Sequence, residues 1–251
     1  MAAETHSSES AFHVMEQFVL TPVVGPLGFA NSNVWMILSG LVVIGLMVLG
    51  MRPRAMVPGR LQGAAEATYQ FVYDMVDETV GHEGRKYFPF VFTLFTFILF
   101  GNLLGLVPYG FTFTSHIVST LALAAIVFVL TTVVALRTHG THFLSYFAPE
   151  GVSPVLLVLV APIEVISYLS RLVSLSVRLF ANMLAGHVML KVFATFVVMM
   201  AGAGTIGIIG AAGPLALNVV LIGFEFLVAF LQAYVFAILT CIYLHDAVHL
   251  H

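Results

Sequence analysis

Long apolar stretches separated by short polar segments run through most of this chain. Three of them predict membrane spans over residues 34–51, 88–108 and 116–136. Each is close to the roughly 20 residues that a helix needs to cross about 30 Å of hydrocarbon. Residues 1–33 precede the first span as a polar leader and an interfacial segment.

Residues 61–80 show a helical period but are too polar for a span. The expected apolar stripe consists of Leu61, Ala64, Ala65, Thr68, Val72, Met75, Val76 and Thr79. The expected polar face consists of Gln62, Glu66, Asp74, Asp77 and Glu78. Apolar residues on one side and acidic residues on the other predict an amphipathic helix lying at the membrane interface.

The last hundred residues predict two unusually long helices, 155–200 and 215–245. At 1.5 Å per residue the first would extend about 70 Å, more than twice the hydrocarbon thickness, so it must tilt strongly or bend. The glycine-rich segment Ala201–Pro214 predicts the break between them. The expected fold is an all-α integral membrane protein. It has five membrane-crossing helices and one interfacial amphipathic helix, the last two crossings forming a strongly tilted antiparallel hairpin.

Composition agrees with this fold class. Hydrophobic residues make up 60% and charged residues 8% of the chain, with a mean hydropathy of +1.05. Soluble domains carry about 25% charged residues. The net charge of -3 gives no reason to expect a nucleic-acid partner, and the single Cys241 excludes an intrachain disulfide or a thiolate metal site. With no G-x-x-x-x-G-K-[ST] loop either, we expect no cofactor, no metal and no catalytic site belonging to this chain alone.

Basic residues outside the apolar stretches all fall on one side of the predicted topology. They are Arg52, Arg54, Arg60, Arg85, Lys86 and Arg137. By the positive-inside rule this side is cytoplasmic. The acidic leader, with Glu4, Glu9 and Glu16, then lies outside, and the C-terminus lies inside.

Arg178 is the most informative residue of the last hundred because it interrupts a stretch apolar enough for lipid. A guanidinium stays protonated and cannot escape the cost of the bilayer by losing its charge. That cost ranges from roughly 3 kcal/mol to more than about 10 kcal/mol. An intramembrane Arg therefore indicates a functional site.

Other polar residues follow the same helical face. Glu164, Ser167, Arg171, Ser174, Arg178 and Asn182 share a stripe about 80° wide, while His187 and Lys191 lie on the opposite side. In the second long helix, Asn218, Glu225, Gln232 and Tyr243 recur on about one face.

The antiparallel hairpin predicts which of these residues share a depth. Residues at equal depth in such a hairpin have a constant sum of residue numbers. Pairing His187 with Glu225, and Arg178 with Gln232, places the turn in both cases at about residue 205, inside the glycine-rich break. Two polar pairings and an independent turn signal therefore agree.

A structural interpretation also fits each of these features. Ser and Thr pack membrane helices together, Asn102 could form an interhelical hydrogen bond, and Arg171 and Lys191 could snorkel along a tilted helix. Four residues that flank the spans could be interfacial: His116, Arg137, His139 and His142. The trio of Arg178, Glu225 and His187 could be a buried ion-pair cluster, although a cation, an acid and an imidazole together favour a proton relay.

Three segments carry a resemblance to a known family. The string Arg178-Leu-Phe-Ala-Asn-Met-Leu-Ala-Gly-His187, the string Asn102-Leu-Leu-Gly-Leu-Val-Pro-Tyr109 and the pair Glu225-x6-Gln232 resemble subunit a of the rotary ATP synthase. The resemblance covers nearly the whole chain. Many bacterial members have an acid at the His187 position and a His at the Glu225 position; the exchange seen here resembles mitochondrial and alphaproteobacterial relatives.

This resemblance implies roles for individual residues. Arg178 matches the essential arginine, and Asn182 and Gln232 match polar residues near it. Glu164 matches the acid of the cytoplasmic half-channel, and His187 and Glu225 match a pair in the outer one. The expected proton path consists of His187, Glu225, Asn182, Gln232, Glu164, Ser174 and, more weakly matched, Asn102.

The resemblance also implies a function and partners. Subunit a is the stator that provides two offset half-channels beside a rotating ring of c subunits. It assembles with peripheral-stalk b subunits and, through other subunits, with a soluble head. The expected location is the bacterial inner membrane, or alternatively the mitochondrial one. A proton-coupled secondary transporter is the main alternative, but it would need an internal repeat and paired broken helices, which the chain lacks. A haem- or quinone-linked redox protein and a purely structural subunit are weaker alternatives.

Overall fold

The computed structural model describes residues 22–24, 29–52, 59–107, 110–140 and 154–249. Residues 1–21 of the predicted leader, together with Arg54, Pro108 and His142, lie outside the described residues. Two short strands, β1 (Pro22–Val24) and β2 (Phe29–Ala30), pair antiparallel just before the first long helix. Every other regular element in the described ranges is helical.

Six α-helices and two 3₁₀ turns make up the described fold. They are α2 (Asn31–Met51), α3 (Arg60–Val80), η2 (His82–Tyr87), α4 (Phe88–Gly105), η3 (Phe113–Ser115), α5 (Ile117–His139), α6 (Pro154–Ala201) and α7 (Thr205–Val248). Five of these helices, α2, α4, α5, α6 and α7, are long and apolar enough to cross a membrane. The predicted all-α membrane fold is confirmed.

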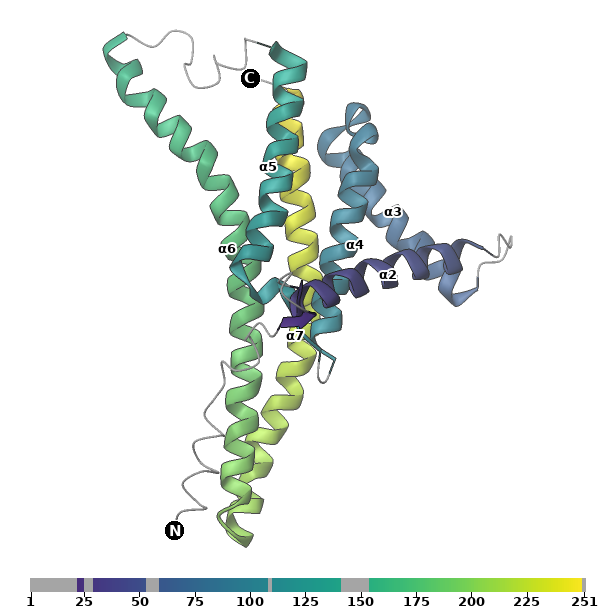
Figure 1. The fold of residues 1–251 in the computed structure, drawn as a ribbon, viewed down its shortest axis with the longest axis vertical. Coiled ribbons are helices and arrows are strands. Elements are labelled where there is room, and N and C mark those ends of the chain that lie inside the picture. Colours follow the sequence, from purple (N-terminus) through teal and green to yellow (C-terminus); the bar gives the residue numbers. More distant parts are fainter. Residues whose placement is uncertain (1–21, 25–28, 53–58, 108–109, 141–153, 250–251) are drawn as a thin grey trace.

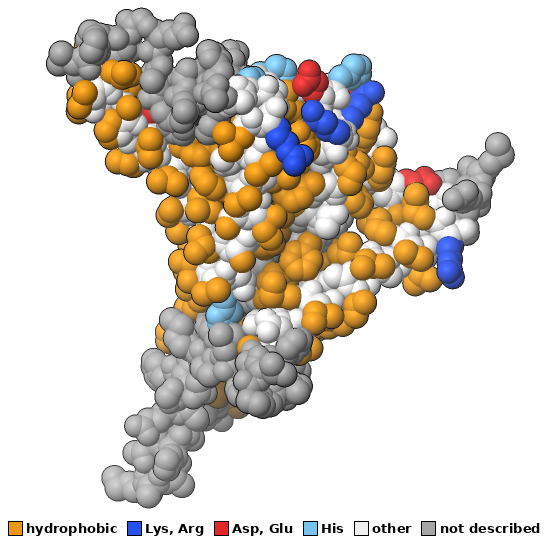
Figure 2. Space-filling view, turned by 45° about the horizontal axis from the view of Figure 1, so that its top comes forward, with side chains coloured by type: hydrophobic (Ala, Val, Ile, Leu, Met, Phe, Trp, Pro, Cys, Tyr) orange, Lys and Arg blue, Asp and Glu red, His pale blue; other side chains and the backbone are white. Residues whose placement is uncertain are grey.

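The outer surface of the bundle is apolar. Leu41, Val158 and Ile206 are 60%, 77% and 87% exposed, respectively. Figure 2 shows hydrophobic side chains covering the flanks, while charged and histidine side chains gather toward one end. A surface of this kind is stable against lipid and unstable against water.

Helices α6 and α7 form a long antiparallel pair, and α6 leans away from α7 toward its N-terminal end (Figure 1). The 21 residues of α2 extend about 31 Å, the thickness of a bilayer core, whereas the 48 residues of α6 extend about 72 Å. Figure 1 also shows α2 running across the direction of α6 and α7. Helices that cross so steeply cannot all stand upright in one bilayer, and the length of α6 favours the predicted strong tilt of the long pair.

The break between the long helices is shorter than the sequence predicts. The prediction of a break over Ala201–Pro214, with a helix starting at residue 215, is wrong. Only residues 202–204 interrupt the helices, and Gly204 has a φ of +89°. Helix α7 already begins at Thr205 and continues through Pro214. Close packing explains the difference. A Cβ on Gly207 would overlap the Met200 carbonyl oxygen, and one on Gly210 would lie 2.6 Å from Met200 Cε. These glycines let the two helices meet immediately beyond the turn.

Small residues also bring α7 into the centre of the bundle. Ala229, Ala233, Ala237 and Cys241 recur every four residues and have no exposed surface. Small side chains at this spacing let neighbouring membrane helices approach closely. Large aromatic side chains fill the space around them, among them the fully buried Phe95 of α4 and Phe113 of η3.

Helix α3 is amphipathic and packs against the bundle. Part of its predicted apolar stripe is buried there and part is exposed. Ala65, Val72, Met75 and Val76 are buried, whereas Leu61 is exposed. Three predictions were wrong at the start of this helix: Leu61 and Ala64, expected on the apolar stripe, are exposed, and Gln62, expected on the polar face, is buried. The cause is α2, which packs so closely here that a Cβ on Gly50 would lie 3.2 Å from Ala65 Cβ.

We predict that Gly101→Ala destabilises the fold. The added Cβ would lie 2.5 Å from Cζ of the buried Phe113, so one of them must move. Overpacking of this kind costs about 1–3 kcal/mol. The measurement is the thermal unfolding midpoint in detergent. Gly40→Ala on α2, where no heavy atom lies within 4 Å, is the control and should keep or raise the midpoint. Equal midpoints for the two variants would contradict the prediction.

Candidate functional site

Arg178 lies on the face of α6 that points away from the protein core. Its side chain is exposed, as are those of Ser174 and Asn182 one turn to either side. The core-facing side of the same helix is closed by Leu175 and Leu179, which are 3% and 1% exposed. In the described part of the chain no carboxylate forms an ion pair with Arg178. Its charge is therefore open to a group outside the described residues.

A groove of about 280 Å³ lies between α6 and α7, one turn from Arg178. It is lined by Asn182, Ala185, Gly186, Met189, Leu221, Phe224, Glu225, Val228, Leu231 and Gln232. Three of the predicted site residues, Asn182, Glu225 and Gln232, thus meet in one place. Apolar side chains form the rest of the wall, which lowers the local dielectric and strengthens every charge interaction inside.

Glu225 is a buried carboxyl in this groove, with 4% of its surface exposed. Its Oε1 atom has no hydrogen-bond partner among the described residues. The carboxyl lies against the backbone of Gly186, where a Cβ would overlap both carboxylate oxygens. A glycine at 186 therefore makes room for the acid. An unpaired buried carboxylate is costly, so its negative charge must be offset by a nearby group or by a proton.

His187 follows Gly186 directly on α6, so its depth is close to that of Glu225. Its Nε2 lies 2.7 Å from Thr112 Oγ1, within hydrogen-bond distance. The described residues show no hydrogen bond between His187 and Glu225. The two groups thus share a depth, as the hairpin predicts, while contacting different neighbours: the α4–α5 connection for the imidazole and the α6 backbone for the carboxyl.

Asn102 joins three elements at the same end of the bundle. Its side chain is fully buried and accepts a hydrogen bond from Thr114 Oγ1 at 2.8 Å. Its Nδ2 donates to the Ala229 carbonyl of α7 at 3.4 Å. These contacts match the interhelical hydrogen bond considered for Asn102 from the sequence. They also fix the connection that carries Thr112.

Thr112 and Thr114 were missed by the sequence reasoning. The available signal was weak: a Phe-Thr-Phe-Thr alternation between two predicted spans. The connection folds back into the bundle, so Thr112 and Thr114 are 5% and 0% exposed. His116 closes the same connection, stacked on Phe111 at 5.2 Å. Burial lowers the pKa of His116, which favours its neutral form.

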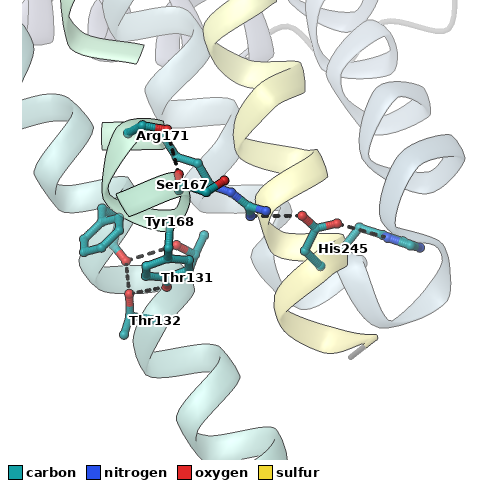
Figure 3. Close-up of polar contacts among 9 residues, drawn as sticks. Thr131, Thr132, Ser167, Tyr168, Arg171 and His245 are labelled. Atoms are coloured by element: carbon teal, nitrogen blue, oxygen red, sulfur yellow. Dashed lines mark hydrogen bonds and ion pairs between the residues drawn. The ribbon is translucent and has the colours of Figure 1, made fainter. Parts of the chain in front are cut away.

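The opposite end of the α6 stripe carries Glu164 and Arg171. Glu164 is half-buried and forms no ion pair within the described residues. Arg171 does not simply snorkel: its Nη1 donates to Asp246 Oδ2 of α7 at 3.0 Å (Figure 3). Asp246 was also missed, because near the end of the last helix it reads as an ordinary surface acid.

The site as a whole offers charge and proton chemistry. It has one exposed permanent cation, one buried carboxyl and one imidazole within three turns of α6 and its partner helix. The described residues contain no group of three or more His, Cys, Asp or Glu side chains that could hold a metal ion. The remaining predicted residue, Ser174, lies on the exposed stripe next to Arg178.

Comparison with known proteins identifies the family. The family profile described as ATP synthase A chain matches residues 33–245. The chain is 58% identical over 250 residues to ATP synthase subunit a of Granulibacter bethesdensis, covering 98% of this chain and 100% of that protein. It is 56% identical over the same coverage to ATP synthase subunit a of Acidiphilium cryptum. The protein of the same name from Parvibaculum lavamentivorans is 51% identical, with 99% of each chain covered. The chain therefore belongs to the ATP synthase A chain family.

Proposed function

We propose that this chain is the proton-translocating stator subunit of an ATP synthase. The observation that carries the proposal is the exposed Arg178, without a carboxylate of its own in the described residues, beside a groove that holds the buried Glu225. A permanent cation turned away from the core is costly in lipid unless a neighbour compensates it. A ring of c subunits, each with a proton-binding carboxylate, is that neighbour in our proposal.

Protons enter from the outside along a path that includes His187 and Glu225. An imidazole and a buried acid at one depth can pass a proton by alternating protonation states. Thr112 Oγ1 contacts Nε2 of the imidazole. In the tautomer whose Nε2–H donates to this hydroxyl, Nδ1 is the nitrogen that accepts a proton. Asn182 and Gln232 continue polar contacts along the groove toward Arg178.

A second path opens at the cytoplasmic end of the stripe, by Glu164 and Ser174. Protonated carboxyls of the rotating ring are neutral and can travel through lipid cheaply, whereas ionised ones cannot. After nearly a full turn such a carboxyl meets this second path and releases its proton. The membrane potential supplies about 2.3 kcal/mol per charge per 100 mV, and two offset paths convert that energy into rotation.

Arg178 separates the two paths. Its nearby positive charge favours the ionised form of a ring carboxyl and thereby drives proton release. The same charge repels protons that would pass directly from one path to the other. A guanidinium suits this role because it keeps its charge even when desolvated.

The proposed setting follows from the family and from the charge distribution. The relatives described above are named ATP synthase subunit a, which implies a complex with a c-ring, peripheral-stalk b subunits and a soluble head. We place the chain in the bacterial inner membrane with its N-terminus in the periplasm and its C-terminus in the cytoplasm. Purification of the chain with no ring of small hairpin proteins would favour the transporter alternative.

We predict that Arg178→Ala abolishes coupled proton transport while the complex still assembles. The charge that separates the two paths is lost, so the rate of ATP-driven acidification of membrane vesicles should fall more than about tenfold. A tenfold fall corresponds to an increase of about 1.4 kcal/mol in activation free energy. Arg178→Lys should fail almost as badly, because an ammonium can lose its proton when desolvated. Val177→Ala, also exposed on α6, is the control and should pump normally. Full pumping by Arg178→Ala would refute the proposal.

We predict that His187 and Glu225 act as a coupled pair. Substituting either one interrupts the outer path, so a second substitution removes little more. In a double-mutant cycle of His187→Ala and Glu225→Gln, proton conduction through the membrane sector should show an interaction energy above about 0.5 kcal/mol. Losses that simply add would show that the two groups work independently.

We predict that Gly186→Ala impairs the outer path without removing any polar group. The new methyl group would displace the Glu225 carboxyl from its position against α6. Proton conduction should fall about tenfold, as expected when a reacting group is misplaced by an ångström or less. Gly223→Ala on α7, with no heavy atom within 4 Å, is the matched control and should conduct normally. Similar conduction by both variants would contradict the role of Gly186.

A further inference from the structure

Two arginines lie on the same face of α6, and their surroundings differ. Arg171 and Arg178 are seven residues apart, about 10 Å along the helix axis and about 20° around it. Arg171 has 25% of its side chain exposed and pairs with Asp246 of α7. Arg178 is exposed and has no carboxylate partner in the described ranges. Among the described residues, one positive charge is thus compensated by a carboxylate and the other is not.

Arg171 is held in place by more than its ion pair. Its guanidinium carbon lies 5.8 Å from the centre of the Tyr168 ring and 5.2 Å from that of Tyr243. Tyr168 is itself tied to α5, with its hydroxyl 2.7 Å from Thr132 Oγ1 (Figure 3). A guanidinium flanked by aromatic rings and bonded to a carboxylate has little freedom to turn outward.

A cavity of about 30 Å³ adjoins this cluster, with room for about one water molecule. Its polar lining comes from Thr131, Tyr168, Arg171, Tyr243 and Asp246, and α5 closes it with apolar side chains. The guanidinium of Arg171 thus faces inward, toward α5 and α7. Among the described residues, His245 is a further titratable neighbour of Asp246, with its Nδ1 4.0 Å from Asp246 Oδ1, and His245 stacks on His249.

Compensation of Arg171 matters for proton transfer at Arg178. In the proposed function, a rotor carboxylate that passes this face of α6 approaches one positive charge, that of Arg178, and then moves away from it. A second bare guanidinium one heptad away would attract the same carboxylate and delay its movement toward the cytoplasmic path. A close ion pair has a field that fades much faster with distance than that of a lone charge.

We propose that Asp246 is a positioning residue for proton transfer: by holding Arg171 inward as an ion pair, it leaves Arg178 as the uncompensated cation that this face of α6 presents to the rotor carboxylate. This inference rests on the proposed function. Asp246 thus selects which arginine acts, without touching the reacting carboxylate.

The test is a set of variants in the assembled complex, measured as ATP synthesis driven by a fixed proton gradient in membrane vesicles. Asp246→Asn releases Arg171 and should slow synthesis about three- to tenfold. The double variant Arg171→Gln with Asp246→Asn removes the competing charge as well, and should return to within about twofold of the wild type. His245→Asn, next to Asp246 in sequence, is the control and should synthesise ATP normally.

A purely structural latch gives the opposite pattern. If the ion pair only fastened α6 to α7, the double variant would be as slow as Asp246→Asn or slower, and that result overturns the inference. Failure of both variants to assemble overturns it too, and so does assembly of the double variant alone, because an unpaired charge that harms only assembly is a structural effect. Arg178→Ala in the same vesicles separates the two proposals: if it fails while Asp246→Asn is unaffected, only the role of Asp246 falls.

Discussion

A guanidinium that cannot lose its proton, held on an apolar helix, is the constraint on which this structure depends. Arg178 must be compensated, and the described residues provide no carboxylate for it. The fold turns it away from the core, on a face of α6 that also carries Ser174 and Asn182. In the proposed function, the surrounding architecture presents this charge beside a route for protons.

Close contact between the two long helices makes that route possible. Glycine at 186 admits the Glu225 carboxyl against the α6 backbone, and glycines after the turn let α7 start beside Met200. The buried stripe from Ala229 to Cys241 keeps α7 in the bundle centre. Glu225 and Gln232 therefore face the α6–α7 groove from a firmly packed helix, so their positions relative to Arg178 are set by the backbone.

The contrast between Arg171 and Arg178 shows how one helix face can carry two equal charges in different surroundings. Both belong to the same polar stripe, and neither residue type nor spacing distinguishes them. A carboxylate on the neighbouring helix does so by pairing with one of them at 3.0 Å. The sequence thus gives the type of each residue, whereas the packing of the helices decides whether its charge is paired within the chain.

Much of this protein was predictable from its sequence because lipid imposes simple rules. Apolar length and basic flanks predicted the spans, the helical period predicted the Arg178 stripe, and the antiparallel register placed Glu225 close to the depth of His187. The tertiary structure alone decided three other features: how short the break before α7 is, that Thr112 folds back to the His187 imidazole, and that Asp246 pairs with Arg171. Periodicity describes one helix at a time, whereas these three features depend on how closely separate segments approach one another.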